Sequence, residues 1–529
     1  MRRLIAATTV LLSALLLFSG LNYYALWDDE AVTALAGEGV WRTGDTSVVL
    51  DHNVVAYRAG LLLRGTHERS TPPLAAYLVA PFVGRSGAQA WVVRFPFAVL
   101  GLASVGLILF WLYRIDAHWF TWLLVGLALV ANVSLWLYCR QCRYYSPAIF
   151  SSIAIAYLYL NWNGSRWQLG LLAAASIILL ASNYLNYVAL QLCLLADYLI
   201  VGRKRRSLGI KDWLIVLVPQ VVVGLAIVLI WNTLGTGNKE YIQGNTILQR
   251  LQLVWMNLRD INRCEYGAGL LLLAAPVLFF VNRKPWLIRA PLVLFGYVTI
   301  VSLLSPQLVR LSPTDADVRY LAAVIPLCIA ISVLVLIEAA RASKWLAIGI
   351  AALAFASNLL NGSWVVNDPE MPMRSTIASF VGELWDPPTE PYSPVIAWIN
   401  QNVKGHESIW VVPDFMTYPL MYHAPKPTYA WQFGTPLPEA FKALPPIHIQ
   451  GGAELPDYLI AFGPVAQQAY DFLQKRRAPY QVVDRLDVNP QDRYRPEIFW
   501  HRFKTVSANP SAGDAIYIFK HGSSASSSR

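Results

Sequence analysis

Long apolar runs bounded by charged residues recur over the first two thirds of the chain. A bilayer core about 30 Å thick is crossed by roughly 20 apolar residues in a helix, so each run predicts a membrane span. About eleven such runs can be identified on this criterion. They cover 4–26, 91–113, 119–138, 146–162, 168–183, 186–201, 213–232, 266–282, 288–304, 319–338 and 345–361. No small-residue cleavage site ends the first run, so we interpret it as a retained helix rather than a signal peptide.

The pattern changes near Gly362. Of the 32 prolines, 12 precede this point and 20 follow it. Short buried runs predict strands, and amphipathic stretches predict helices. The predicted strands are 408–412, 458–462, 480–483 and 515–519, and the predicted helices are 394–403 and 465–477. This alternation indicates a soluble α/β domain over 362–522, followed by a flexible tail at 523–529.

Composition supports a membrane protein. Hydrophobic residues make up 56% of the chain and charged residues 14%, whereas soluble domains carry about 25% charged residues. Disordered and fibrous classes are excluded as well, and five cysteines are too few for a disulfide scaffold. We therefore predict a polytopic α-helical membrane protein with about eleven spans and a C-terminal extracytoplasmic α/β domain. The transmembrane module is expected at 1–361, with an outer loop at 27–90.

The net charge of +10 could indicate nucleic-acid binding, but its placement favours membrane orientation. Basic residues occupy alternate turnarounds between the predicted spans, and acidic residues gather in the others. The basic residues are Arg114, Arg166, Arg203, Lys204, Arg205, Arg206, Lys211, Arg283, Lys284, Arg289, Arg341 and Lys344. We expect a multi-pass protein of a bacterial inner membrane with its N-terminus in the cytoplasm and its C-terminal domain outside. No nucleic-acid partner is expected.

The outer loop carries the most informative polar residues. It opens with Asp28-Asp29-Glu30, which follow the first predicted helix directly. Carboxylates in this place can act as a general base or bind a metal ion, although a solvated helix end explains them too. Thr71-Pro72-Pro73-Leu74 follows, and Arg94-Phe95-Pro96 opens the second run. An arginine at that depth requires an anionic partner.

These residues resemble the motifs of GT-C glycosyltransferases, in the bacterial branch related to protein O-mannosyltransferases and lipid A aminoarabinose transferases. The family's Asp-Glu pair corresponds to Asp29-Glu30, its Pro-Pro-Leu to 72–74 and its Arg-Leu-Pro to 94–96. Weaker matches are Arg143-Tyr144-Tyr145 and Arg319-Tyr320-Leu321 with Pro326.

The resemblance implies a polyprenyl-phosphate sugar donor and a lipid, glycan or protein acceptor outside the cytoplasm. It also implies Asp29 as the base that accepts the acceptor's proton, with Glu30 supporting it or sharing a divalent metal cation. A single displacement of this kind inverts the anomeric carbon. Aminoarabinose transferases have a lysine directly before Pro-Pro-Leu, where this chain has Thr71, so the resemblance implies the enzyme class and not the specific lipid A activity.

Arginine binds phosphate oxygens in paired hydrogen bonds, and tyrosine suits the membrane interface. The candidates for binding the donor phosphate are Arg69, Arg94, Arg140, Arg143, Tyr144 and Arg319. The candidates for binding substrate are His52, Tyr145, Arg259 and Asp260. An interfacial belt explains the arginines and tyrosines near 140–145 equally well, and an amphipathic helix over 246–263 explains Arg259 and Asp260 without a ligand.

Other interpretations stay open. A transporter or flippase of lipid-linked glycans is the main alternative, and an assembly partner without catalysis is a third. The two cysteines of Cys139-x-x-Cys142 are interpreted as structural thiols, because no second pair completes a zinc site. Asp197 lies within a predicted span and is expected to pair with the adjacent basic loop at 203–206.

Overall fold

The computed structural model describes residues 1–56, 60, 63–83, 89–115, 118–205, 207–231, 245–264, 268–311, 313, 317–357, 359–360, 375–387, 390–430, 455–463, 465–475, 478–487 and 515–522. The chain forms two compact units. The first contains Met1–Gly20 and Phe95–Asp386. The second contains Leu21–Arg94 together with the described residues from Pro387 onward. The segment after the first helix therefore belongs to the same unit as the C-terminal sheet.

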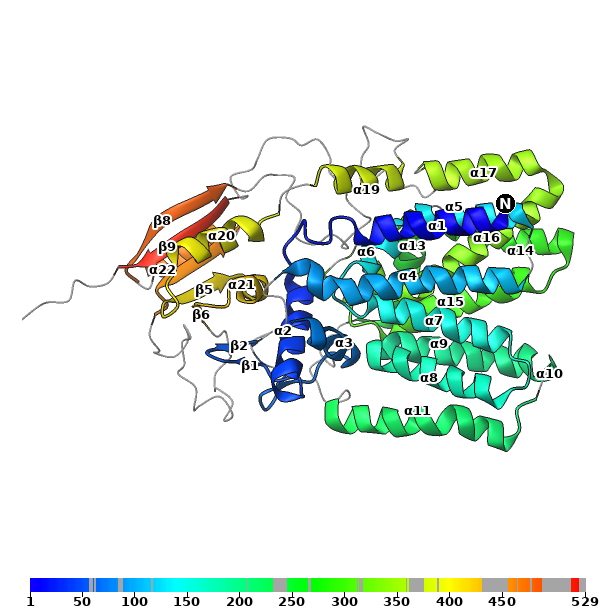
Figure 1. Ribbon diagram of the computed structural model, residues 1–529, viewed down its shortest axis with the longest axis horizontal. Coiled ribbons are helices and arrows are strands. Elements are labelled where there is room, and N and C mark those ends of the chain that lie inside the picture. Colours follow the sequence, from blue (N-terminus) through cyan, green and yellow to red (C-terminus); the bar gives the residue numbers. More distant parts are fainter. Residues whose placement is uncertain are drawn as a thin grey trace, which may run out of the picture. The chain divides into compact units, whose positions relative to one another are not determined.

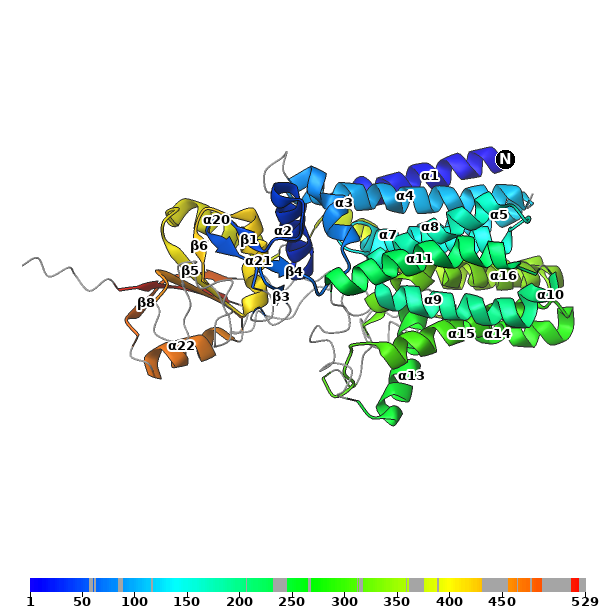
Figure 2. The ribbon, with the colours of Figure 1, turned by 90° about the horizontal axis from the view of Figure 1, so that it is seen from below.

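The first unit is built of long helices that lie lengthwise beside one another (Figure 1). They are α1 (Arg2–Phe18), α4 (Ala90–Arg114, whose first turn lies in the second unit), α5 (Trp119–Ala131), α6 (Val133–Cys139), α7 (Tyr145–Leu160), α8 (Arg166–Ser182), α9 (Tyr184–Asp197), α11 (Ile210–Trp231), α14 (Ala268–Asn282), α15 (Trp286–Leu304), α16 (Ile325–Ala342) and α17 (Lys344–Ala356). Helix α13 (Ile247–Cys264) packs on α15 and crosses the direction of the other helices (Figure 2). Shorter elements are η2 (Tyr198–Gly202), α10 (Arg203–Arg205), η3 (Val318–Val324) and α19 (Thr376–Trp385).

Several of these helices can cross a bilayer. Among the described residues, five are long and apolar enough, namely Ala90–Arg114, Tyr184–Gly202, Ile210–Trp231, Trp286–Leu304 and Val318–Ala342. Helices α5 and α6, which meet at a bend of 56°, form a sixth candidate. Every run predicted from the sequence contains a described helix. The polytopic helical membrane protein is thus confirmed, and the count of eleven spans stays a prediction.

Two runs end or break earlier than their hydrophobicity indicates. The first was expected to continue to residue 26, but α1 ends at Phe18, and Gly20 adopts a φ of 66° that favours glycine. The run 119–138 breaks at Asn132, because the side chain of Asn132 accepts a hydrogen bond from the N–H of Leu135 at 2.7 Å. Asparagine is a preferred residue before a helix start, so it begins a new helix inside an apolar stretch.

Ion pairs lie at one end of the helices of the first unit. Arg289 donates through two guanidinium nitrogens to the carboxylate of Asp197, and the Tyr159 hydroxyl donates to the same carboxylate at 2.5 Å. Arg289 is thus a partner of Asp197 that the sequence did not predict, and the expected pairing with the loop 203–206 stays a prediction. The anionic residue pairs with a cation on α15, a helix that packs against its own helix α9.

The second unit begins with two helices in close contact. Helices α2 (Asp28–Thr43) and α3 (Leu74–Val83) bury Ala36, Val40, Ala76 and Ala80 between them. A Cβ atom at Gly37 would lie 2.4 Å from Cγ1 of Val79, so the two backbones approach as closely as glycine allows. Two hairpins connect the helices, one of β1 (Val49–Leu50) with β2 (Asn53–Val54) and one of β3 (Leu63–Arg64) with β4 (His67–Glu68).

The tail contributes a five-stranded mixed sheet in the order β6-β5-β7-β9-β8. Strands β6 (Thr428–Tyr429), β5 (Ser408–Val412) and β7 (Tyr458–Phe462) are parallel, and β9 (Ala515–His521) and β8 (Tyr480–Asp487) are antiparallel additions. The other described elements are α20 (Tyr392–Asn402), η4 (Asp414–Met416), α21 (Thr417–His423) and α22 (Val465–Lys475). All four predicted strands and both predicted helices are confirmed within a few residues, and 476–477 at the end of one predicted helix lie outside the described residues.

Successive side chains of β7 face opposite sides of the sheet, as strand geometry requires. Leu459 and Ala461 pack against α22. On the other face, the ring of Tyr458 lies 5.6 Å from Trp398, which belongs to α20. Figure 2 shows α20 and α22 on opposite faces of the sheet. Strand β7 is therefore buried on both faces, which explains why its sequence is a continuous apolar run.

Candidate functional site

The acidic triplet forms the first turn of α2. Unsatisfied backbone N–H groups give a helix N-terminus a partial positive charge, which favours carboxylates there. Asp28 and Glu30 are buried, whereas Asp29 is half-buried. The backbone carbonyl of Asp29 accepts a hydrogen bond from the hydroxyl of Thr33 at 2.9 Å. Asp29 is therefore the member of the triplet with the most solvent contact.

Glu30 forms an ion pair with Arg94. Nε of Arg94 donates to Oε1 of Glu30 at 2.9 Å, and Nη2 donates to Oε2 at 2.5 Å. Glu30 has 0% and Arg94 6% of its surface exposed, so the pair is shielded from water. This carboxylate is the anionic partner that the depth of Arg94 predicted. The predicted role of Arg94 in phosphate binding stays a prediction, and in this structure its guanidinium is engaged within the chain.

The same guanidinium holds the segment 21–26, which leads into the triplet. Nη1 of Arg94 donates to the carbonyl of Leu21 at 2.8 Å and to that of Tyr24 at 2.9 Å. Nη2 donates to the carbonyl of Ala25 at 3.1 Å. Together with the two bonds to Glu30, these contacts match the five N–H groups of an arginine. One buried side chain thus fixes both the segment and the helix turn that follows it.

Two residues of the tail bind N–H groups of this segment. The N–H of Leu26 donates to Nε2 of His423 at 3.0 Å. The N–H of Ala25 donates to Oε1 of Glu390 at 3.4 Å. Glu390 also accepts from the N–H of Tyr392 at 2.6 Å, and its burial raises the pKa of its carboxyl. The sequence gave no motif for either residue, because both lie about 360 residues or more from their partners in the chain.

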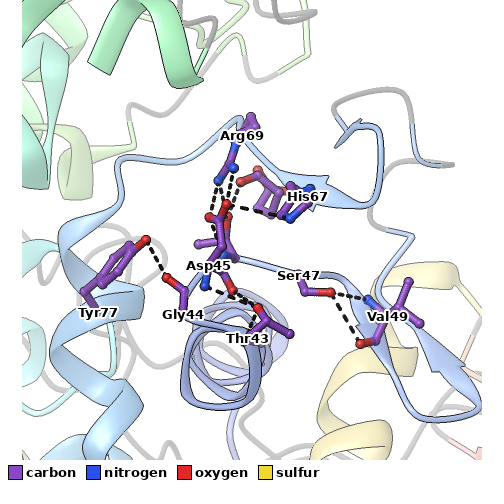
Figure 3. Close-up of polar contacts among 11 residues, drawn as sticks. Thr43, Gly44, Asp45, Ser47, Val49, His67, Arg69 and Tyr77 are labelled. Atoms are coloured by element: carbon purple, nitrogen blue, oxygen red, sulfur yellow. Dashed lines mark hydrogen bonds and ion pairs between the residues drawn. The ribbon is translucent and has the colours of Figure 1, made fainter. Parts of the chain in front are cut away.

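Arg69 forms a second two-pronged ion pair. Figure 3 shows its guanidinium against the carboxylate of Asp45, with Nη1 2.7 Å from Oδ1 and Nη2 2.6 Å from Oδ2. Nη1 also donates to the hydroxyl of Thr46 at 2.7 Å. The hydrogen bond from Arg69 lowers the pKa of Asp45 to about 2. Arg69 is buried, so this pair connects the chain after α2 with the chain before α3.

Glu68 organises the turn before the Pro-Pro-Leu motif. Its carboxylate accepts from the N–H of Ser70 at 2.5 Å and from the N–H of Thr71 at 3.2 Å. The side chain is buried, and burial raises the pKa of its carboxyl. The backbone at Thr71, where aminoarabinose transferases have lysine, is therefore fixed from within the chain.

His52 and its neighbour connect this region to the sheet. Nε2 of His52 lies 3.1 Å from the carbonyl oxygen of Lys426. The side chain of Asn53 donates to the carbonyl of Pro427 at 3.0 Å and accepts from the N–H of Tyr429 at 2.8 Å. Asn53 thus pairs with the edge strand β6 as a neighbouring strand would. The predicted contact of His52 with substrate is untested.

Arg140 follows α6 and reaches the end of α1. Its Nη1 donates to the carbonyl of Leu16 at 2.6 Å, and its guanidinium carbon lies 5.8 Å from the centre of the Phe380 ring. The last carbonyls of a helix have no partner within the helix, and a cation there is favourable. Arg140 therefore closes the C-terminal end of α1.

The other predicted residues near 140–145 gather with Arg319. The guanidinium of Arg143 lies 5.6 Å from the Tyr144 ring centre, and the rings of Tyr144 and Tyr145 are 4.5 Å apart. The hydroxyl of Tyr144 donates to the carbonyl of Arg319 at 3.4 Å. Nε of Arg319 donates to Asp317 at 2.7 Å. The structure thus brings two arginines and two tyrosines from distant parts of the sequence into one cluster.

Arg259 and Asp260 pair with each other on α13. Nε of Arg259 donates to Oδ1 of Asp260 at 2.7 Å, and Arg263 donates to the same oxygen at 3.2 Å. Asp260 is fully buried. Their predicted contact with substrate is untested, and this arrangement shows a carboxylate shared by two arginines.

The chain was compared with known proteins. No family model and no curated protein matches its sequence. Among solved structures, it is similar to the crystal structure of ArnT from Cupriavidus metallidurans in the apo state, with a TM-score of 0.56 and 14% identity. The match covers 98% of this chain and 97% of that chain. The chain has the ArnT fold. The predicted GT-C architecture is thereby confirmed, including the small C-terminal sheet domain.

The carboxylates at the start of α2 do not fit a metal site in this structure. Both oxygens of Glu30 are bound by Arg94. Across the described ranges, no group of three or more His, Cys, Asp or Glu side chains is arranged to hold a metal ion. The predicted sharing of a divalent cation by Asp29 and Glu30 is not supported by this donor set, and we derive no step through a metal.

The predicted site residues fall into separate groups. In the second unit, Glu30 and Arg94 form one pair, while Arg69 belongs to another. In the first unit, Arg143, Tyr144, Tyr145 and Arg319 form one cluster, and Arg259 and Asp260 another pair. Arg140 binds α1 instead.

Proposed function

We propose that this chain is a membrane glycosyltransferase that moves a sugar from a polyprenyl-phosphate donor to an acceptor outside the cytoplasm. The observation that carries the proposal is the ArnT fold over nearly the whole chain. ArnT is a lipid A aminoarabinose transferase, and the motifs at 29–30, 72–74 and 94–96 resemble those of the same family. The bacterial inner membrane, with the tail on the outer side, is the corresponding location.

Asp29 is the proposed general base. Of the three carboxylates in the turn, Glu30 is neutralised by Arg94, whereas Asp29 is half-buried and retains contact with solvent. Asp29 would accept the proton of the acceptor hydroxyl while the hydroxyl oxygen attacks the anomeric carbon. The bond from that carbon to the phosphate oxygen breaks, and the lipid phosphate leaves with the bonding electrons. One displacement of this kind inverts the anomeric configuration.

Positive charge would stabilise the departing phosphate. Arg143 and Arg319 are the proposed donors of that charge, because 143–145 and 319–321 resemble arginine-containing motifs of the same family. Arg94 and Arg69 each already bind a carboxylate in two places, which makes them weaker candidates. Thr71 replaces the lysine of aminoarabinose transferases, so we leave the sugar and the acceptor open.

The decisive experiment supplies purified chain with radiolabelled polyprenyl-phosphate sugars in proteoliposomes, together with lipid and glycan acceptors. Transfer appears as release of polyprenyl phosphate and movement of the label to an acceptor. A flippase would instead move the intact donor between leaflets and leave the sugar–phosphate bond unbroken. Intact donor after incubation with every sugar and acceptor class would contradict the proposal.

A further inference from the structure

The segment ahead of the acidic turn is bound along both edges of its backbone. Arg94 binds its carbonyls, and the tail binds its N–H groups through His423 and Glu390. We propose that His423 is a positioning residue that sets the place of Asp29, with Glu390 as a second anchor. This inference rests on the proposed function, since it assigns the tail a part in transfer.

The distance along the chain between anchor and base is short. Leu26 precedes Asp29 by three residues, and Trp27 between them adopts an extended backbone before α2 begins. The carbonyl of Trp27 already accepts the first helical bond, from the N–H of Ala31 at 2.9 Å. A shift of Leu26 is therefore transmitted to the first turn of α2 through few rotatable bonds. Displacement of a reacting group by about 1 Å can cost a hundredfold in rate.

His423 is held firmly enough to act as an anchor. It ends α21, where Tyr418, Leu420, Met421 and Tyr422 are all buried. Helix α21 packs against α2, the helix that carries Asp29. Since Nε2 accepts a hydrogen bond from Leu26, the ring must be neutral with its proton on Nδ1. The chemistry that the anchor needs is thus a hydrogen-bond acceptor at the position of Nε2.

Three variants separate positioning from general stability. His423→Phe keeps an aromatic ring but removes the acceptor, and His423→Gln restores an acceptor oxygen at a similar reach. Trp398→Phe is the matched control. It removes one hydrogen bond within the tail, which Nε1 of Trp398 donates to Asp484 at 2.8 Å. Neither residue has a described hydrogen bond to the segment 21–26. Each is assayed with the radiolabelled polyprenyl-phosphate sugar that the wild-type chain consumes.

We expect His423→Phe to lower kcat about tenfold, which corresponds to a loss of about 1.4 kcal/mol of transition-state stabilisation. The KM for the donor should stay within about twofold of the wild-type value. His423→Gln should lie within about threefold of wild type, and Trp398→Phe should equal it. Hydrogen–deuterium exchange should show faster exchange in peptides covering 21–30 in His423→Phe alone. Full activity in His423→Phe, or equal losses in Phe and Gln variants, would overturn the inference.

The exchange measurement does not depend on catalysis. If the wild-type chain transfers no sugar, the proposed function fails, and the exchange of 21–30 still decides whether His423 anchors the segment. Unchanged exchange in His423→Phe would then overturn the anchor itself.

Discussion

Removing the charge of Glu30 should destabilise the protein, because its carboxylate balances a buried arginine. The substitution Glu30→Gln keeps the size and shape of the side chain. Oε1 and Oε2 of Glu30 now accept hydrogen bonds from Arg94 at 2.9 and 2.5 Å. In the glutamine variant an NH₂ group replaces one of these oxygens, so a donor would face a donor. The guanidinium, 6% exposed, would then lose the Glu30 carboxylate and keep its hydrogen bonds to three backbone carbonyls.

The size of the effect follows from burial. Breaking a buried ion pair by removing one partner costs about 3–5 kcal/mol. At about 2–4 °C per kcal/mol, the apparent melting temperature in detergent should fall by about 10 °C. Arg94→Met should lower it by a similar amount, since three carbonyls and Glu30 lose their donor. The double variant, Glu30→Gln with Arg94→Met, should lose less stability than the sum of the two single losses, because it removes both charges of the pair together.

The assay is a melting curve of each purified variant in one detergent, with Asp29→Asn as the matched control on the neighbouring carboxylate. Asp29→Asn should melt within about 2 °C of wild type, because asparagine keeps the size of this half-buried side chain and substitutions outside the buried core usually change stability by less than about 0.5 kcal/mol. If Glu30→Gln melts like wild type while transfer is lost, Glu30 takes part in the chemistry and the structural assignment of its pair with Arg94 is refuted.

Three further predictions concern other contacts of the fold. Gly37→Ala should destabilise by about 1–3 kcal/mol through overpacking against Val79, and Val79→Ala should restore part of the loss in melting measurements. Arg250→Met should lower the free energy of unfolding by about 1–3 kcal/mol, because the buried guanidinium of Arg250 donates to the carbonyl of Ser305 at the end of α15, at 2.6 Å. An unchanged melting temperature would exclude this capping role. The pKa of Asp45 is lowered from 3.8 to about 2, so its ion pair stabilises the fold above about pH 4 and is lost as the pH falls toward 2. Wild type should therefore lose more stability over that window than Asp45→Asn, and identical pH profiles would contradict the assignment.

The tail shows how far local pattern predicts structure. Strand β7 is a continuous apolar run, and its bounds were predicted correctly because it is buried on both faces. Strand β8 was predicted to end at Val483 but continues to Asp487. It lies at the edge of the sheet, where Arg485 and Asp487 are exposed, so the strand lacks the apolar pattern that identifies buried strands.

Long-range pairing limits what the sequence could reveal about the site. The need of Arg94 for an anion was predictable from its depth, but Glu30 lies 64 residues away and its selection depends on the fold. Arg69 and Arg140 carry the same charge and donors as a phosphate-binding arginine. Whether such a group binds a carboxylate, a helix end or a phosphate depends on what packs beside it, and no local pattern records that.

The central claim, that Asp29 is the base of a polyprenyl-phosphate glycosyltransferase, is tested most directly by one measurement. Purified wild type and Asp29→Asn are incubated with the same radiolabelled polyprenyl-phosphate sugar and acceptor, and the polyprenyl phosphate released per enzyme is counted. We predict turnover by wild type and a loss of about a hundredfold or more in Asp29→Asn, as expected for removal of a general base. Release by Asp29→Asn at the wild-type rate would contradict the account.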